Sequence, residues 1–108
     1  MKYLMLVCVD ESIEVEEAEA FPDAWVEEMD ARGVRRFGSR LRPVRDATTV
    51  QLRGGEVLLT DGPFADTKEQ IGGFDILECR DLDEAIEVAS KHPAARFGTL
   101  EVRPLWEE

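Results

Sequence analysis

The chain has 108 residues, of which 44% are hydrophobic and 34% are charged, and its formal net charge is −11. This length suits one domain with one core, and the acidic balance argues against a nucleic-acid-binding surface. Two isolated cysteines and one histidine lack the spacing of a metal site, and no apolar run is long enough to span a membrane. We therefore expect a single domain over residues 1–108, located in the cytoplasm with reduced thiols.

The charges are unevenly distributed along the chain. Residues 10–30 contain ten acidic side chains and no basic one, whereas residues 32–53 contain seven arginines and one acid. Two interpretations stay open. Both segments are solvated faces that offset one another, or some arginines, Arg40 and Arg42 especially, point into a cleft and bind an anionic ligand.

The first third of the chain predicts a strand, a helix and a second strand. Residues 2–10 are apolar at both odd and even positions, which is typical of a central strand covered on both faces. One apolar stripe is formed by Phe21, Trp25 and Met29, with Ala18 in register upstream, and it predicts a helix that begins near Pro22 and ends at Gly33. Residues 34–43 alternate loosely and predict an extended segment.

Residues 47–60 predict a β-hairpin. Two strand-like runs, 47–53 and 56–60, are joined by Gly54-Gly55, a two-residue loop that supplies the positive φ angles of a tight hairpin turn. In that register Arg53 and Glu56 face each other across the turn.

The segment from Asp61 to Gly73 holds most of the unusual local chemistry. Gly62 precedes Pro63 and predicts a stiff turn, because the proline ring pushes the residue before it out of the helical region. Thr67 and Gln70 have the spacing of a capping box at the start of a helical turn. We expect a rigid loop between two apolar strands, suited to lining a pocket.

The last third predicts a strand, a helix and a final strand, over residues 73–80, 82–91 and 99–106. Asp81 with Glu84 has the form of a helix cap, and His92-Pro93 ends that helix. The residues expected on its buried side are Leu82, Ala85, Ile86, Val88 and Ala89. His92 is expected to have a structural role against free carbonyls at the helix end.

This order predicts an α+β fold. Two helices cannot cover both faces of a six-stranded arrangement, so both should lie on one face of a ferredoxin-like antiparallel sheet with an inserted β-hairpin. The second face is then exposed, yet the sequence makes it apolar. The simplest cover is a second copy of the chain, which gives an isologous homodimer.

The motif Asp61-Gly-Pro-Phe64, continued by Ala-Asp-Thr-Lys-Glu-Gln-Ile-Gly-Gly-Phe at residues 65–74, resembles the hallmark of the DGPF branch of the YCII-related proteins. The first seven residues, the helix after Asp81 and the ending at 101–104 look like the same family. The resemblance implies a ferredoxin-like subunit of a dimeric α/β barrel. In such relatives a histidine of the first helix meets an aspartate in a pocket, but this chain has no histidine there, so that pair does not transfer.

Five residues are candidates for a site. Asp61 is a possible general base if it points inward, although an aspartate here also suits a simple turn-holding role. Lys68 is a possible partner that binds an anion or lowers the pKa of Asp61, against the alternative of a surface lysine. Phe64, Arg40 and Arg103, with Lys68, are the expected ligand-binding residues.

Two functions are compatible with these features. The first is a homodimer that binds a small polar or anionic ligand and performs cofactor-independent acid–base chemistry, because the sequence has no phosphate loop, dinucleotide fingerprint or metal cluster. The alternative is a non-catalytic regulatory module in which the acidic segment docks a basic partner. The resemblance adds to that alternative, because DGPF proteins are often encoded beside extracytoplasmic-function sigma factors.

Overall fold

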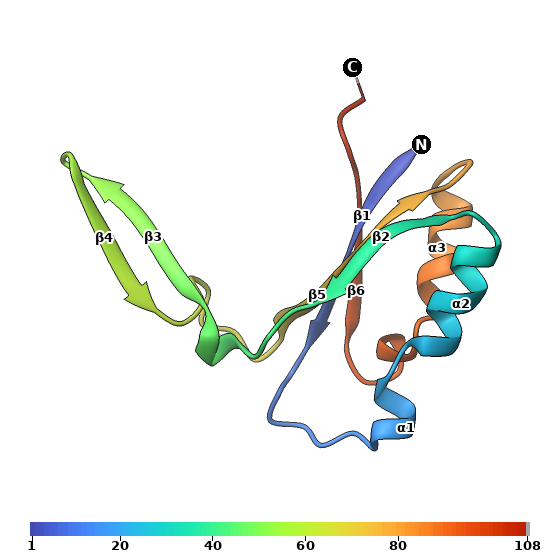
Figure 1. Cartoon of the computed structure of the whole chain (residues 1–108), viewed down its shortest axis with the longest axis horizontal. Coiled ribbons are helices and arrows are strands. Elements are labelled where there is room, and N and C mark those ends of the chain that lie inside the picture. The colour runs from blue at the N-terminus through green and yellow to red at the C-terminus, as the bar shows by residue number, and fades with distance from the viewer. Residues whose placement is uncertain (108) are drawn as a thin grey trace.

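The computed structural model describes residues 1–107 and has the expected α+β composition (Figure 1). The elements in chain order are β1 Lys2–Val9, α1 Glu17–Ala20, α2 Asp23–Ala31, β2 Arg35–Arg40, η1 Val44–Asp46, β3 Thr48–Arg53, β4 Glu56–Asp61, β5 Gln70–Glu78, α3 Leu82–Ser90, η2 Pro93–Ala95 and β6 Thr99–Pro104. The two η segments are single 3₁₀ turns. Among the described residues, no helix is sufficiently long and apolar to cross a membrane.

Four strands form one antiparallel sheet in the order β2-β5-β1-β6, with β1 in the interior as the sequence predicts. The hairpin β3–β4 forms a separate two-stranded sheet inserted between β2 and β5. Figure 1 shows α2 and α3 together on one side of the four-stranded sheet. The ferredoxin-like arrangement with an inserted hairpin is therefore confirmed.

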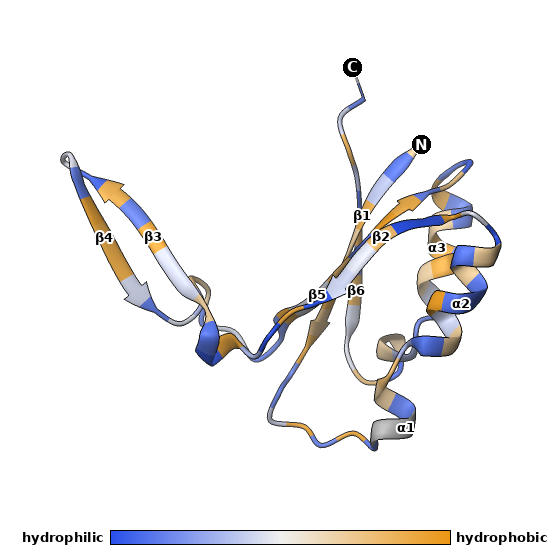
Figure 2. Ribbon diagram, in the orientation of Figure 1, coloured by the Kyte–Doolittle hydropathy of each residue, from blue (hydrophilic) through white to orange (hydrophobic). Residues whose placement is uncertain are grey.

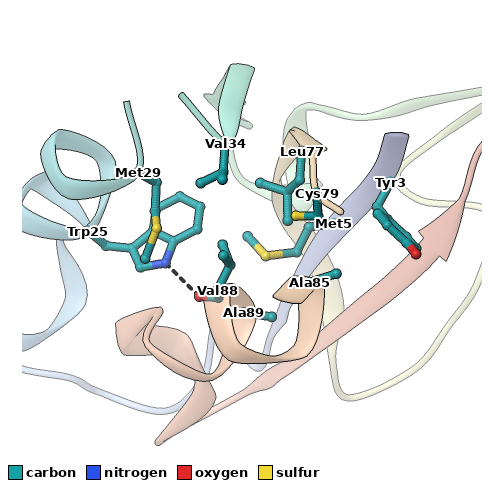
Figure 3. Close-up of a cluster of buried hydrophobic side chains, with 10 residues drawn as sticks. All are labelled: Tyr3, Met5, Trp25, Met29, Val34, Leu77, Cys79, Ala85, Val88 and Ala89. Carbon is teal, nitrogen blue, oxygen red and sulfur yellow. Dashed lines mark hydrogen bonds between the residues drawn. The ribbon is translucent and has the colours of Figure 1, made fainter. Parts of the chain in front are cut away.

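The core lies between the sheet and the two longer helices, and Figure 3 shows its side chains converging there. It consists of Tyr3, Met5, Trp25, Met29, Val34, Leu77, Cys79, Ala85, Val88 and Ala89. Trp25 is a core residue, and its indole Nε1 donates a hydrogen bond of 2.9 Å to the carbonyl of Val88. This bond satisfies the one polar group that the ring would otherwise bury unpaired.

Helix α3 begins where the capping pattern predicts. Asp81 Oδ1 accepts a hydrogen bond of 2.9 Å from the backbone N–H of Glu84, and the Glu84 carboxylate accepts one from the N–H of Arg80. The expected burial of Leu82 and Ile86 is wrong, because their side chains are 51% and 52% exposed. Two alanines and Val88 form the buried side, so the contact surface of α3 is narrower than its apolar sequence indicates.

The face of the sheet that points away from the helices is apolar along the middle of β1 and β5, and no helix of residues 1–107 covers it. Leu4, Leu6, Phe74 and Ile76 are only half-buried there. The ring of Phe37 is 61% exposed, with its centroid 5.8 Å from that of Phe74. We call this surface the open face. Figure 2 shows apolar residues along the strands of the sheet as well as in the helices.

The hairpin β3–β4 projects from the rest of the chain on the side opposite the helices (Figure 1). Gly54 and Gly55 form its turn with φ angles of +56° and +81°, and Arg53 lies opposite Glu56, as predicted. The radius of gyration is 15.7 Å, whereas a compact chain of this length is expected at about 13 Å. The projecting hairpin accounts for this excess.

Candidate functional site

A cavity of about 690 Å³ opens between the helix side of the sheet and the segment that leads into α2. Its sheet wall includes Val7, Gly73 and Asp75, and its opposite wall includes Phe21 and Val26. Gly72 and Gly73 end the Asp61–Gly73 segment and both line the cavity. The segment that the sequence singles out therefore contributes to the cavity through its glycines.

Asp75 places a buried carboxylate on the cavity wall. The residue is 6% exposed and points to the core side of β5. Its Oδ1 accepts a hydrogen bond of 2.8 Å from Arg35 Nε, and Arg35 Nη1 also donates to Asp30 at 3.2 Å. Burial raises the pKa of Asp75, and the bond and charge of Arg35 oppose this rise. The guanidinium therefore makes a buried charge tolerable at this position.

Gly38 creates the space that this carboxylate occupies. It lies directly opposite Asp75 in the pairing of β2 with β5. A Cβ atom on Gly38 would lie 2.0 Å from Asp75 Oδ1 and 2.7 Å from the carbonyl oxygen of Phe74. No real side chain fits at such distances, so the carboxylate and this glycine depend on each other.

His92 is the second buried titratable group at the cavity, and it is 5% exposed. Its Nδ1 accepts a hydrogen bond of 3.0 Å from the backbone N–H of Ala94, so in the neutral ring the proton is on Nε2. The ring also contacts Trp25 edge-on, with centroids 4.8 Å apart. The structural role is thus as expected, but His92 caps the turn that follows rather than the carbonyls of α3. Burial lowers the pKa of His92 to about 4, so the ring is neutral at pH 7.

Two arginines at the cavity add positive charge. The Arg40 guanidinium lies 5.0 Å from the centroid of the Phe21 ring, a distance at which the ring attracts the cation. Arg45 lines the same cavity. Within the part of the chain that the structure describes, neither Arg40 nor Arg45 forms an ion pair, so both are available to an anionic group.

The five residues predicted from the sequence lie in different places. Arg40 lines the larger cavity, and Phe64, 80% exposed, lines a second cavity of about 490 Å³ at the base of the hairpin. Asp61 ends β4 with an exposed side chain, and Lys68 is exposed in the loop that follows. Arg103 is in β6 beside Glu101, with which it forms an ion pair. This single chain does not bring the five together.

The Asp61–Gly73 segment turns as predicted but contains no helical turn. Gly62 has a φ of +99°, which fits a glycine before proline. The capping box is wrong, because Gln70 donates to the carbonyls of Ala65 and Thr67, at 2.6 and 3.1 Å, and the hydroxyl of Thr67 donates to the Glu69 carbonyl. These side chains close the loop onto carbonyls instead of capping free N–H groups, and β5 begins already at Gln70.

The sequence contained a signal for Asp75 that the motif-based reasoning missed. On β5 the even positions Phe74 and Ile76 point to the open face, so Asp75 falls at the same parity as Leu77 on the core side. A charge at a core position of an otherwise apolar strand requires a partner, and an arginine-rich segment lies upstream. The pairing itself depends on the position of β2 beside β5 in the fold.

The cavity lining combines the buried Asp75 carboxylate, a neutral imidazole and guanidinium groups with three further carboxylates, those of Asp10, Glu11 and Asp23. These groups can bind a polar or anionic molecule and exchange protons with it. Among the side chains that the structure describes, no three histidine, cysteine, aspartate or glutamate groups gather in a way that could hold a metal ion.

The fold is that of an α+β, ferredoxin-like protein with an open sheet face, and comparisons with known proteins agree. The family model of the YCII-related domain matches residues 1–108. The chain is 35% identical over 122 residues to "Uncharacterized protein R00369" of Rhizobium meliloti (strain 1021), covering 97% of this chain and 92% of the relative. The chain therefore belongs to the YCII-related family, and the resemblance seen in the sequence is confirmed.

One solved structure with the same fold is 5-chloro-2-hydroxyhydroquinone dehydrochlorinase from Burkholderia phenoliruptrix AC1100, in complex with 2,5-dihydroxybenzoquinone. It superimposes with a TM-score of 0.52 and covers 100% of this chain and 96% of its own. The sequence identity is 16%, so this likeness shows the fold.

The contact between Gly38 and Asp75 predicts a cost for any side chain at residue 38. We expect Gly38→Ala to lower the free energy of unfolding by about 1–3 kcal/mol, because its Cβ would overlap the carboxylate. Urea unfolding measures this change. In an Asp75→Ala background, the same substitution should cost about 1 kcal/mol less, since only the clash with the Phe74 carbonyl remains. Equal costs in both backgrounds would contradict the proposed packing.

The buried His92 predicts a loss of stability in mild acid. Its pKa is about 4 in the folded chain and about 6.5 when unfolded, so the unfolded chain binds the proton more readily between these values. The His92 contribution should lower the free energy of unfolding by about 2 kcal/mol between pH 7 and pH 5. Asn at residue 92 keeps an acceptor for the Ala94 N–H but does not titrate. The pH dependence of urea unfolding should therefore be shallower in His92→Asn, and identical slopes would show that His92 is not buried neutral.

Proposed function

We propose that this protein is a homodimer that binds a small polar or anionic molecule in the larger cavity and performs cofactor-independent acid–base chemistry on it. The observation that supports this most strongly is the Asp75 carboxylate, which is buried yet lines an open cavity. Arg35 compensates this carboxylate through Oδ1 alone, and a buried carboxylate that lines a cavity favours a role in binding or catalysis.

The two oxygens of Asp75 have different environments. Oδ1 is held by Arg35 and packs against Gly38. Among residues 1–107, no hydrogen bond engages Oδ2, and this oxygen is not among the fully buried unpaired atoms. Oδ2 is therefore the atom offered to a ligand. A raised pKa makes this carboxylate a stronger base than an exposed aspartate, and it can accept a proton from a ligand hydroxyl.

The other cavity groups complete this role. Arg40 carries a cation at the cavity and is suited to an anionic oxygen of the same ligand. The neutral His92 ring adds a polar edge without adding charge. The related fold solved with 2,5-dihydroxybenzoquinone guides the choice of a first probe, an acidic hydroxylated ring with oxygens at opposite ends.

The homodimer follows from the open face. Half-buried apolar side chains of β1 and β5 form a continuous surface with the exposed ring of Phe37, and none of the described helices covers it. Exposed apolar patches of this kind mark interaction sites, and a second copy brings an identical patch. Both cysteines are free thiols, which fits a reducing compartment such as the cytoplasm.

The ligand proposal predicts specific effects of substitution. Isothermal titration with 2,5-dihydroxybenzoquinone and a panel of hydroxylated aromatic acids should detect binding to the native chain, with weakening of at least tenfold in Asp75→Asn and in Arg40→Ala. Asp75→Asn keeps the shape of the side chain and removes its charge. Circular dichroism confirms that each variant is folded.

The matched controls are Asp61→Asn and Lys68→Ala, because the sequence-based assignment of these residues to the site stays a prediction. We expect both to bind like the native chain, since neither side chain lines the larger cavity. Loss of binding in these two variants, with Asp75→Asn unaffected, would move the site to the Asp61–Gly73 loop. If no probe of the panel binds, the result favours the alternative function, a non-catalytic regulatory module.

The dimer proposal predicts an assembly of two 12.2 kDa chains at micromolar concentration. Sedimentation equilibrium measures the mass. Ile76→Asp places a charge at the centre of the open face and should give monomers, because the charge would be buried without a partner. Ile86→Asp is the matched control, since Ile86 is 52% exposed on α3 and lies outside the open face. If Ile76→Asp and Ile86→Asp dimerise equally well, the open face is not the interface.

A further inference from the structure

The projecting hairpin has an apolar face that no other part of residues 1–107 covers. We call β3 and β4 the arm, and we call Val50, Leu52, Val57 and Leu59 its aliphatic face. In the hairpin register Val50 lies opposite Leu59, and Leu52 lies opposite Val57. The four side chains are 63–68% exposed. Two directly opposed aliphatic pairs therefore form one continuous apolar strip along the arm.

The opposite face of the arm differs. Positions that alternate with the aliphatic face point to the other side, because successive side chains of a strand alternate. Its members are Thr49, Gln51, Arg53, Glu56, Leu58 and Thr60. Leu58 is the single large apolar side chain among them and is 42% exposed. The arm is thus amphipathic, with the pattern of a two-stranded ribbon that packs one face against another surface.

A free hairpin of this kind is not expected to be stable in water. An isolated two-stranded ribbon is marginal, and its order normally depends on packing against a third element. Yet the arm is paired continuously from Thr48–Asp61 to Arg53–Glu56, and it lies away from the four-stranded sheet. Its covering surface must come from outside this chain.

The position of the arm indicates what covers it. Figure 1 shows the arm on the same side of the four-stranded sheet as the open face, with both longer helices on the other side. Any molecule that covers the open face is therefore placed beside the arm. We propose that the aliphatic face of the arm packs against the second copy of the chain, so that each subunit of the homodimer holds the other with its arm.

The net charge of the chain is compatible with a second copy as the covering molecule. The chain has a net charge of −11, so two copies repel one another unless their contact surfaces carry little charge. Residues 48–61 contain one arginine and two acids. Arg53 and Glu56 lie on the opposite face, and Asp61 shares the aliphatic face only at the base of the arm, beyond the two opposed pairs. On the open face, Glu101 and Arg103 of β6 lie opposite Leu6 and Leu4 and neutralise one another in an ion pair. A second copy supplies both the arm and the open face.

The size of the strip fits an addition to the sheet contact. A Val or Leu side chain buries about 60–120 Å², so the four partly exposed members contribute roughly 250 Å² per copy. A stable interface buries about 800 Å² per partner. The arm alone is therefore too small to hold a dimer, so it adds to a contact that the open face makes. The inference therefore rests on the proposed homodimer and adds a second, separate contact to it.

The test compares two matched double variants on opposite faces of the arm. Leu52→Ser with Val57→Ser removes one opposed pair of the aliphatic face, and Gln51→Ser with Leu58→Ser removes the neighbouring opposed pair of the other face. Sedimentation equilibrium should show at least a tenfold larger dimer dissociation constant for the first and less than a threefold change for the second. Near-ultraviolet circular dichroism checks that the core around Trp25 is unchanged in both.

A second measurement keeps the inference testable if the first double variant unfolds the hairpin. Val57→Cys and Leu58→Cys place single thiols on adjacent residues of opposite faces, and peptide mass spectrometry follows their alkylation separately from Cys8 and Cys79. We expect Val57→Cys to react at least fivefold more slowly in the dimer than after dilution to monomers, with Leu58→Cys unchanged.

The outcomes separate the two proposals. A native chain that is monomeric at all concentrations removes the homodimer and the arm contact together. A native dimer in which Val57→Cys and Leu58→Cys react at the same rates in dimer and monomer overturns the arm contact alone and leaves the open-face dimer standing. Slow alkylation of Val57→Cys in the diluted monomer also overturns it, because the arm would then be covered within one chain.

Discussion

A sheet with two apolar faces and helices on one of them is the constraint on which this structure depends. β1 buries Tyr3 and Met5 against the helices, and its alternate residues Leu4 and Leu6 point to the open face. Burial of apolar surface is the main stabilising term in a domain of this size, and a small domain cannot leave half of it in water without a cost. Because β1 is apolar on both faces, the open face favours a covering surface from outside the chain. The arm lies on the same side of the sheet as the open face.

The sequence predicts the elements well where local patterns decide them. The Gly54-Gly55 turn, the Asp81 cap and the central position of β1 all follow from local chemistry or from one strand's pattern. The errors share a cause. Thr67 and Gln70 match a helix cap, but the loop in which they lie closes onto carbonyls before β5 begins. Leu82 and Ile86 satisfy helical periodicity, but the sheet admits only the narrow side of α3, so tertiary packing overrides the pattern.

The candidate site shows the same limit more strongly. A conspicuous motif drew attention to Asp61 and Lys68, whereas the buried carboxylate of the larger cavity lies at Asp75, after the two glycines that end this segment. Asp75 depends on Arg35 and Gly38, which are about forty residues away in sequence and adjacent only because β2 pairs with β5. The spacing of residues within one segment cannot reveal side chains that meet only because two distant strands pair. An anomalous charge in an apolar strand could have indicated the position, though not the partners.

The cavity and the arm lie on opposite sides of the sheet, but they share a support. Leu41, Pro43 and Arg45, between β2 and β3, line the larger cavity, and the arm begins three residues after Arg45. Pro43 has its φ fixed by its ring, and Ala47 donates from its N–H to Val44 in the 3₁₀ turn between them, so this connection is stiff. A contact that fixes the arm against a second copy therefore also restrains the residues that line the cavity. In the proposed homodimer, assembly on one side of the sheet is in this way coupled to the shape of the cavity on the other, although no described residue is common to both surfaces.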